Sequence, residues 1–241
     1  MDNVILNEYD YRTIESVKLQ DHINACVDGT LWIKENYINV PIESYLDIPG
    51  WVNDAQTIFK KAVDESEDDD ILVEIGTYFG QSACLMGSLI KNSNKKLKFD
   101  TFDTYEQLDP SMRAGFHPQQ FIDYRFGNLN NTAPFSEIVK MHLSVCNVEK
   151  FVNIIVCDAK HSHHFYKDET IKMFYIDGIN NQNDLLDIFI NIWPKIKKNG
   201  FISGDDIGFT DVKNAINKFC IEFDYPFENI EITDLSYFIR K

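Results

Sequence analysis

The stretch "ILVEIGTYFGQSA", residues 71–83, places a short apolar run before two glycines and the start of an apolar helical segment. This order predicts a buried strand, a tight turn at Gly76 and Gly80, and a helix from about Gln81 to Lys91. Glycine is the default residue in strained turns because it has no Cβ. The acid Glu74 within the strand is unusual, since a buried carboxylate requires a partner. Residues farther along the chain indicate what that partner is.

Strands and helices alternate on both sides of this stretch. Residues 53–63, "NDAQTIFKKAV", place four apolar side chains on one helical face, with Asn53 as the expected N-cap. A later helix is expected within residues 183–198, "NDLLDIFINIWPKIKK". Four further strands are expected at residues 97–103, 151–158, 171–177 and 200–206. This alternation predicts an α/β fold with a parallel sheet covered by helices on both faces.

Each of the later strands ends in aspartate. The carboxyl ends of parallel strands share one edge of the sheet, where ligands bind in such folds. A nicotinamide dinucleotide is disfavoured as the ligand, because the turn "GTYFG" lacks the G-x-G-x-x-G pattern. The aspartates expected at the ligand-binding edge are Asp103, Asp158, Asp177, Asp205 and Asp206.

The charge and hydrophobicity of the sequence argue against two classes of binding partner, nucleic acids and membranes. The 241 residues carry a net charge of -15, which argues against a nucleic-acid partner because phosphate binding needs clustered Lys and Arg. No apolar run reaches the roughly 18 residues of a membrane span, and the acidic N-terminus lacks a signal-peptide core, so no membrane partner is expected. Five scattered cysteines favour free thiols in a reducing compartment, and we expect a cytoplasmic protein. The acidic run at residues 64–70 is interpreted as a solvated loop.

The domain organisation is expected to be simple. Residues 51–241 form one domain, and residues 1–50 form an arm that serves as a lid, a dimer contact or both. A homo-oligomer, a dimer, is therefore expected. Residues 104–135, rich in proline and glycine, are interpreted as an insertion that closes over the substrate.

The pattern V-E-I-G-x-x-x-G-x-S at residues 73–82 resembles the first motif of class I S-adenosylmethionine-dependent methyltransferases. Residues 174–219, from "FYIDG" through "NGFISGDDIGF" to "NAINKF", resemble the sugar O-methyltransferase branch of the macrocin O-methyltransferase type. The resemblance implies a Rossmann-like, doubly wound, mostly parallel seven-stranded sheet with an antiparallel last strand. It implies that S-adenosylmethionine binds along Glu74, Gly76, Thr77, Tyr78, Gly80, Ser82, Asp103, Thr104, Asp158, Ala159 and Asp177. In that family the acid at the position of Asp103 accepts bonds from the two ribose hydroxyls, and the position of Asp158 and Ala159 lies by the adenine.

Three carboxylates carry the chemistry that the resemblance implies. Asp177, Asp205 and Asp206 end two strands, and bare carboxylates at such spacing would raise each other's pKa values. A divalent cation such as Mg²⁺ relieves this repulsion and leaves sites open for substrate hydroxyls. Asp177 is then both a metal ligand and the base that takes the proton of the attacking hydroxyl. The expected substrate is a small-molecule sugar, in a nucleotide sugar or a glycoside.

Some positions depart from the branch, and alternatives remain open. Asn180, Gln182 and Ile207 replace the residues that relatives often carry, which predicts different substrate contacts. A catechol-type O-methyltransferase uses a similar strand-end arrangement, although it usually ends the fifth strand in Asp-Asn, and a non-catalytic binding subunit is the third possibility. The cluster His161, His163 and His164 does not have the spacing of a common structural zinc site and is expected to begin the helix after the third strand.

Overall fold

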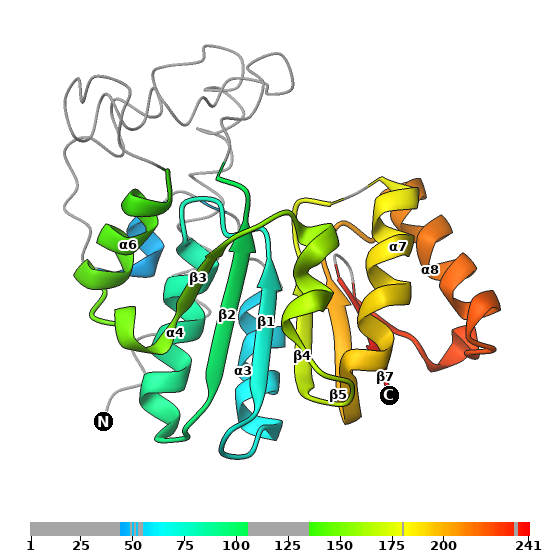
Figure 1. Ribbon diagram of the computed structural model, residues 1–241, viewed down its shortest axis with the longest axis horizontal. Helices are drawn as coiled ribbons and strands as arrows, with labels where there is room; N and C mark the ends of the chain where they lie inside the picture. The colour runs from blue at the N-terminus through cyan, green and yellow to red at the C-terminus, as the bar shows by residue number, and fades with distance from the viewer. Residues whose placement is uncertain are drawn as a thin grey trace, which may run out of the picture.

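The computed structural model describes residues 44–48, 50, 52, 55–105, 135–179, 181–233 and 236–241. Within them the chain forms one seven-stranded sheet in the order β3-β2-β1-β4-β5-β7-β6 (Figure 1). Strands β1 to β5 are parallel, and β7 is antiparallel to both β5 and β6. The Rossmann-like class, the mostly parallel sheet and the antiparallel last strand are therefore confirmed. The strands are β1 (Ile71–Ile75), β2 (Lys98–Asp103), β3 (Asn153–Val156), β4 (Ile171–Ile176), β5 (Ile196–Gly204), β6 (Glu231–Ile232) and β7 (Tyr237–Arg240).

Helices cover both faces of the sheet and form two apolar cores. Helices α3, α4 and α6 pack on one face, and α7 and α8 on the other (Figure 1). Every residue of β4 is buried, as expected for a central strand that is covered on both sides. The α-helices are α3 (Ala55–Glu65), α4 (Gln81–Ser93), α6 (Phe135–Val145), α7 (Gln182–Ile192) and α8 (Thr210–Glu222). Short 3₁₀ helices are η2 (Tyr45–Asp47), η4 (Glu149–Phe151), η5 (Ala159–Phe165), η6 (Trp193–Lys195) and η7 (Phe227–Asn229).

Helix α4 begins and ends where the sequence predicts a change of backbone conformation. Gly80 precedes it with φ 85°, and Asn94 follows it with φ 58°. Both values lie in the left-handed region, which glycine and asparagine tolerate best. The strand, turn and helix expected from residues 71–83 are thus confirmed.

Three expected boundaries are wrong. The helix within residues 183–198 ends at Ile192, and the strand β5 already starts at Ile196. A shift in the β4–β5 register allows this early start, and Asn199 takes φ 63° there. Strand β3 is shorter than expected, because residues 157 and 158 leave the sheet before η5.

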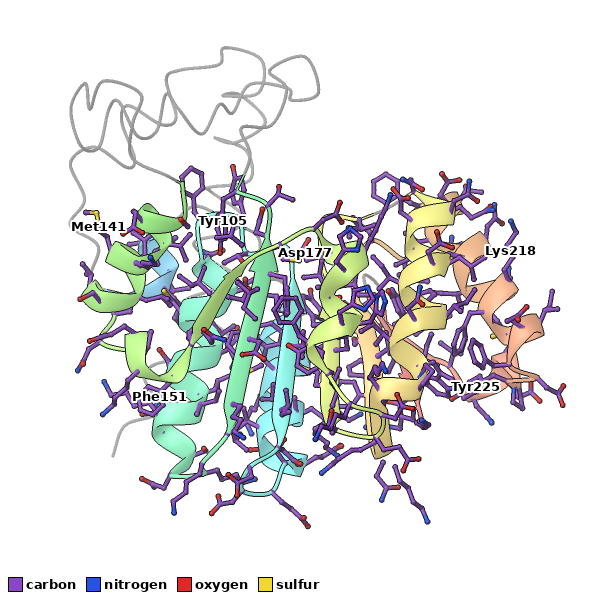
Figure 2. The ribbon with its side chains drawn as sticks, in the orientation of Figure 1. Tyr105, Met141, Phe151, Asp177, Lys218 and Tyr225 are labelled. Carbon is purple, nitrogen blue, oxygen red and sulfur yellow. The ribbon has the colours of Figure 1, made fainter. Side chains whose placement is uncertain are left out.

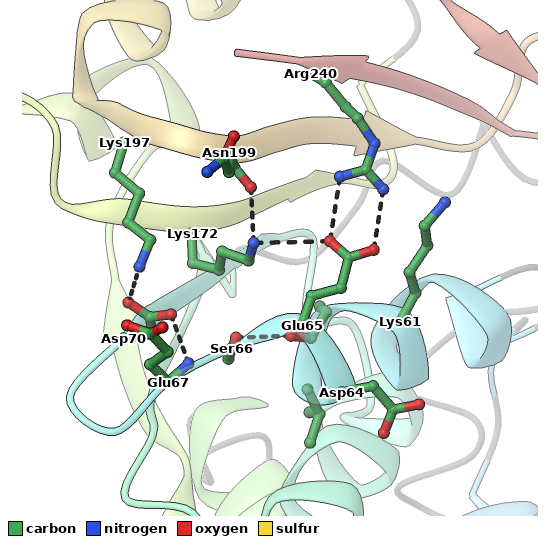
Figure 3. Close-up of polar contacts among 12 residues, drawn as sticks. Lys61, Asp64, Glu65, Ser66, Glu67, Asp70, Lys172, Lys197, Asn199 and Arg240 are labelled. Atoms are coloured by element: carbon green, nitrogen blue, oxygen red, sulfur yellow. Dashed lines mark hydrogen bonds and ion pairs between the residues drawn. The ribbon is translucent and has the colours of Figure 1, made fainter.

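The acidic run at residues 64–70 is the solvated loop that we expected only in part, because five of its seven residues are exposed but two are buried. Helix α3 continues through Glu65, whose carboxylate accepts two hydrogen bonds from Arg240 at 3.1 Å (Figure 3). Asp70 is buried and pairs with Lys197. These partners lie far away in the sequence, so the composition of the run did not reveal them. The expected N-cap Asn53 lies outside the described residues.

Only short parts of the expected N-terminal arm and of the expected insertion lie within the described residues. Tyr45 and Ile48 are buried in the core against α4, whereas most of the expected arm lies outside the described residues. Residues 106–134 of the expected insertion also lie outside them, and Phe135 begins α6. Cys84, Cys146, Cys157 and Cys220 are free thiols. Among the described residues, none of the helices has the length and apolar character needed to cross a bilayer.

Candidate active site

The strand register brings four sequence-predicted residues into one row at the carboxyl edge of the sheet. Ile75 pairs with Phe102 and with Ile176, and Ile176 pairs with Gly204. The next residue on each strand therefore lies at the same level. These residues are, in spatial order, Asp103, Gly76, Asp177 and Asp205. Figure 2 shows Asp177 at this edge.

The glycine turn fits closely against the next strand. Gly76 has φ 92°, and a Cβ at this position would lie 2.4 Å from the Asp177 carbonyl oxygen. The Asp177 amide donates to the Ile75 carbonyl at 2.9 Å, so the two segments are held side by side. A side chain at position 76 would force them apart. The predicted need for glycine at this position is confirmed by both its conformation and its surroundings.

Asp103 is held by the backbone of two tyrosines. Its Oδ2 accepts the Tyr78 amide and its Oδ1 accepts the Tyr105 amide, both at 2.9 Å. Tyr78 has φ 49° and Tyr105 φ 53°, left-handed values that are uncommon for aromatic residues. Each carboxylate oxygen can accept more than one hydrogen bond, so both keep capacity for a further donor. A pair of neighbouring hydroxyls fits this arrangement.

Glu74 is a fully buried acid directly below the turn. Its Oε2 accepts the Thr101 hydroxyl at 2.6 Å, and Thr101 is in turn 2.5 Å from the Thr77 hydroxyl. Its Oε1 is buried without a hydrogen-bond partner among the described residues. Burial raises the pKa of Glu74 to about 7, against the opposing effect of the Ser82 and Thr101 hydroxyls. A buried carboxylate oxygen with no donor is a position that a cationic ligand group would complete.

Asp177 lies among other carboxylates and is only partly exposed. Burial, followed by the charges of Asp205, Glu74 and Asp206, raises its pKa well above the usual value. Burial also raises the pKa of Asp206, which takes φ 60°. An acid whose pKa is raised towards neutrality is a suitable proton acceptor for catalysis.

Asp177, Asp205 and Asp206 lie near one another, but their side chains are not oriented to coordinate one metal ion. Among the described residues, no three His, Cys, Asp or Glu side chains come together in an arrangement that could hold a metal ion. Asp177, Asp205 and Asp206 offer the oxygen donors that Mg²⁺ prefers. Their side chains would have to turn towards a common point to bind one ion.

The remaining predicted residues occupy two places. Thr77, Tyr78 and Ser82 belong to the glycine turn and the first turn of α4, close to Glu74 and Asp103. Asp158 instead caps η5, where its Oδ1 accepts the Lys160 amide at 2.9 Å. Thr104 follows Asp103, and Ala159 begins η5. The expectation that the histidine cluster begins a helix is confirmed only in part, because His161, His163 and His164 lie within this short 3₁₀ helix.

Sequence reasoning missed two contributors to the site. Thr101 lies below Asp103 on β2 and holds Glu74, which the alternation of β2 towards one face could have suggested. His142 of α6 is 1% exposed, and its Nδ1 lies 2.8 Å from the Phe79 carbonyl oxygen in the glycine turn. These two residues are 63 positions apart, and the sequence contains no signal that joins them.

A mostly parallel sheet in this order with β7 antiparallel, together with a glycine turn after β1 and an acid at the end of β2, is the architecture of class I S-adenosylmethionine-dependent methyltransferases. The chain belongs to the methyltransferase family. Residues 73–207, more than half of the chain, match the family model described as "Methyltransferase domain". No curated protein matches the sequence significantly.

Solved structures share the fold at low sequence identity. The O-methyltransferase NovP is 16% identical over 78% of this chain and 79% of its own, with a TM-score of 0.57. An S-adenosylmethionine-dependent O-methyltransferase from Thermotoga maritima is 12% identical over 81% of this chain and 70% of its own, with a TM-score of 0.53. The TDP-rhamnose 3'-O-methyltransferase of calicheamicin biosynthesis is 13% identical over 77% and 76%, with a TM-score of 0.50.

Proposed function

We propose that this methyltransferase transfers a methyl group from S-adenosylmethionine to a hydroxyl of a sugar, with the help of a divalent cation. The observation that carries the proposal is the row of Asp103, Gly76, Asp177 and Asp205 at the carboxyl edge, with Glu74 buried below it. In this proposal, each of these residues either binds a different group of the cofactor or takes part in the transfer reaction.

The cofactor part of the proposal rests on how the described residues fit S-adenosylmethionine. Both oxygens of Asp103 keep capacity for the ribose hydroxyls. Glu74 has an unpartnered oxygen, and the cofactor carries an ammonium and a sulfonium, which are the cationic groups that a buried carboxylate needs. Gly76 lets the turn lie close against the Asp177 backbone, because a Cβ there would be 2.4 Å from the Asp177 carbonyl oxygen. When bound, the cofactor supplies an electrophilic methyl group on sulfur.

The base of the reaction is Asp177 in this proposal. An alcohol is a weak nucleophile while it is protonated, and a positioned base contributes typically ~10²- to 10⁴-fold to the rate. Without a cation, the raised pKa of Asp177 makes its carboxylate a better proton acceptor than an ordinary aspartate. A cation held by the aspartates would lower this pKa, but it would also acidify the substrate hydroxyl that gives up the proton. The place of Asp177 beside Gly76 keeps this acceptor next to the turn that receives the cofactor.

The cation is proposed from the chemistry of the donors. Asp177, Asp205 and Asp206 lie at adjacent strand ends, and the charges of Asp205 and Asp206 add to burial in raising the pKa of Asp177. A bound divalent cation would lower the pKa of a substrate hydroxyl and offset the repulsion. Asp177, Asp205 and Asp206 are the residues that would hold it.

A sugar is favoured over a catechol as the acceptor. The fifth strand ends in Asp205-Asp206, whereas catechol-type enzymes usually have Asp-Asn at this place. One of the structures with this fold acts on TDP-rhamnose by its printed name, and its hydroxyl-bearing substrate is of the proposed class. The catechol-type activity is the second candidate.

A methyl-transfer assay tests the proposal directly. The protein is incubated with isotopically labelled S-adenosylmethionine and a panel of nucleotide sugars, glycosides and catechols, with Mg²⁺ and separately after exhaustive chelation. We expect label on a sugar only, and only with the cation. Label on a catechol would replace the substrate assignment, and full turnover after chelation would remove the cation. Cofactor binding without transfer to any acceptor would favour a non-catalytic role.

A further inference from the structure

Helix α6 contacts the glycine turn, which connects β1 to α4, through two of its side chains that lie about one helical turn apart. His142 Nδ1 lies 2.8 Å from the Phe79 carbonyl oxygen, and both residues are buried. Three positions earlier, Val139 lies against Gly80, where a Cβ would be 2.8 Å from the Val139 Cγ1. Residues three apart in a helix share one face. This face of α6 therefore lies directly against the turn that connects β1 to α4.

The contact matters because the turn is built on a residue with little conformational preference of its own. Gly80 takes φ 85°, yet glycine adopts positive and negative φ about equally well. The Phe79–Gly80 peptide could therefore rotate without a steric penalty at Gly80. Such a rotation would reverse the directions of the Phe79 carbonyl and the Gly80 amide, and would change the backbone surface on which a ligand rests.

Two hydrogen bonds oppose this rotation, one on each side of the peptide. The Gly80 amide donates to the Thr77 carbonyl at 2.8 Å, within the turn itself. The Phe79 carbonyl accepts from His142, on a different helix. A carbonyl can only accept, so His142 donates from Nδ1 in this arrangement. Among the described residues, His142 thus provides a side-chain hydrogen bond from outside the turn that opposes a change in the orientation of this peptide.

We propose that His142 is a positioning residue for S-adenosylmethionine binding, which acts by holding the Phe79–Gly80 peptide in its binding orientation. His142 does not touch the cofactor in this proposal. Its donor sets the shape of the turn before the cofactor arrives, so less ordering is required on binding. The inference rests on the cofactor that the family binds, and it does not depend on the identity of the acceptor sugar.

Three variants separate the hydrogen bond from the packing of α6. His142→Leu fills much of the same space but has no donor. His142→Asn places an amide N–H near the position of Nδ1 and can restore the bond. Leu143→Ala is the matched control, because Leu143 is also buried on α6 and its loss leaves the His142 contact in place. Melting temperatures of all three variants show whether the destabilisation is comparable.

The dissociation constant of S-adenosylmethionine is measured by isothermal titration for the full-length wild type and each variant. We expect His142→Leu to bind about tenfold more weakly, the size of one lost hydrogen bond. His142→Asn and Leu143→Ala should stay within about threefold of wild type on the same grounds. Unchanged affinity of His142→Leu, or an equal loss in Leu143→Ala, would overturn the proposal.

Amide hydrogen exchange of the protein without cofactor gives an independent result. Exchange of peptides that cover residues 77–84 should be faster in His142→Leu than in wild type, and His142→Asn should restore the protection. Equal exchange in all forms would contradict the role of His142 in the turn. If the wild type did not bind S-adenosylmethionine at all, the cofactor assignment would fail, while the exchange experiment would still decide what His142 does.

Discussion

The acidic side chains at the two edges of the sheet have opposite surroundings. Cationic side chains surround them at the amino edge, and other carboxylates surround them at the carboxyl edge. At the amino edge, Glu65 accepts two hydrogen bonds from Arg240 and lies 3.6 Å from the ammonium of Lys172 (Figure 3). Lys172 is buried and also donates to the Asn199 carbonyl at 2.7 Å. At the carboxyl edge, after burial itself, the strongest influences on the pKa of Asp177 are other carboxylates. The described residues thus complete the amino edge, and we propose that cationic ligands complete the carboxyl edge.

The pKa shifts of Glu65 and Glu74 show the same difference between the amino and carboxyl edges. Partial burial alone would raise the pKa of Glu65, but the hydrogen bonds and charge of Arg240, with Lys172 and Lys61, lower it. No cation among the described residues acts on Glu74 in this way, and burial raises its pKa to about 7. Both residues are acids of β1 or of the helix before it, so their surroundings and not their residue type decide the result.

The largest expected effect is the loss of turnover in Asp177→Asn. The amide keeps the shape of the side chain but cannot accept the hydroxyl proton, so we expect the rate to fall by roughly 10²- to 10⁴-fold. Saturating Mg²⁺ should not restore it, and cofactor affinity should change little by comparison. Steady-state kinetics of labelled methyl transfer measures the rate. Activity close to wild type would remove Asp177 from the role of base.

The next effect concerns Glu74 and pH. Because its pKa is raised in the folded state, the protonated form is favoured there, and the resulting stability is full below about pH 4.5 and is lost as pH rises through about 7. Relative to Glu74→Gln, we expect the cofactor-free wild type to lose roughly 2–3 kcal/mol of unfolding free energy between pH 5 and 8. Denaturant unfolding across this range measures the difference. Parallel profiles for the two proteins would show that Glu74 ionises normally.

Asp103→Ala should weaken S-adenosylmethionine binding by about 1–3 kcal/mol, because two charge-assisted hydrogen bonds to the ribose are lost. The variant also releases the Tyr78 and Tyr105 amides, so its melting temperature must be measured with the affinity. Asp103→Asn is the companion variant, since its amide oxygen can still accept one of these bonds. Wild-type affinity in both variants would exclude Asp103 from the ribose role.

The smallest effect is expected at the amino edge. Glu65→Gln removes the ion pair with Arg240 and leaves Lys172 less well compensated, which should cost about 1 kcal/mol because Glu65 and Arg240 remain partly exposed. The pKa of Glu65 is lowered, so its stabilisation is present at neutral pH and is lost as pH falls into the acidic range. Cofactor affinity should be unchanged. If Glu65→Gln weakened S-adenosylmethionine binding as much as Asp103→Ala does, the proposed difference between the two edges would be wrong.

The sequence predicts the alternation of strands and helices along the chain well, because local patterns determine it. Apolar runs that end in aspartate, separated by helical segments, are sufficient to place Asp103, Asp177 and Asp205 on one edge of a parallel sheet. The helix expected through residue 198 was wrong for a physical reason. Residues 193–195 instead form the short 3₁₀ helix η6, with Pro194 in its first turn, and from Ile196 the shifted pairing of β5 with β4 outweighs the local helical spacing.

Contacts between distant residues could not be predicted from one sequence. The ion pair of Glu65 with Arg240 joins positions 175 residues apart, and the His142 contact with Phe79 joins positions 63 apart. The spacing of acidic residues in the sequence also does not determine whether their side chains coordinate one metal ion. Three aspartates at neighbouring strand ends place the donors close together, but side-chain rotation decides whether they share one ion.

The central claim is that the carboxyl edge holds carboxylates in readiness for a cationic cofactor. Its most direct test is isothermal titration of S-adenosylmethionine at pH 7 in two buffers with different ionisation enthalpies. Binding of a cation should favour the ionised form of Glu74, whose pKa is about 7, so we expect net proton release and tighter binding as pH rises from about 6 to 8. Glu74→Gln should lose most of this proton release. Absence of binding, or binding to the wild type with no proton exchange, would contradict the account.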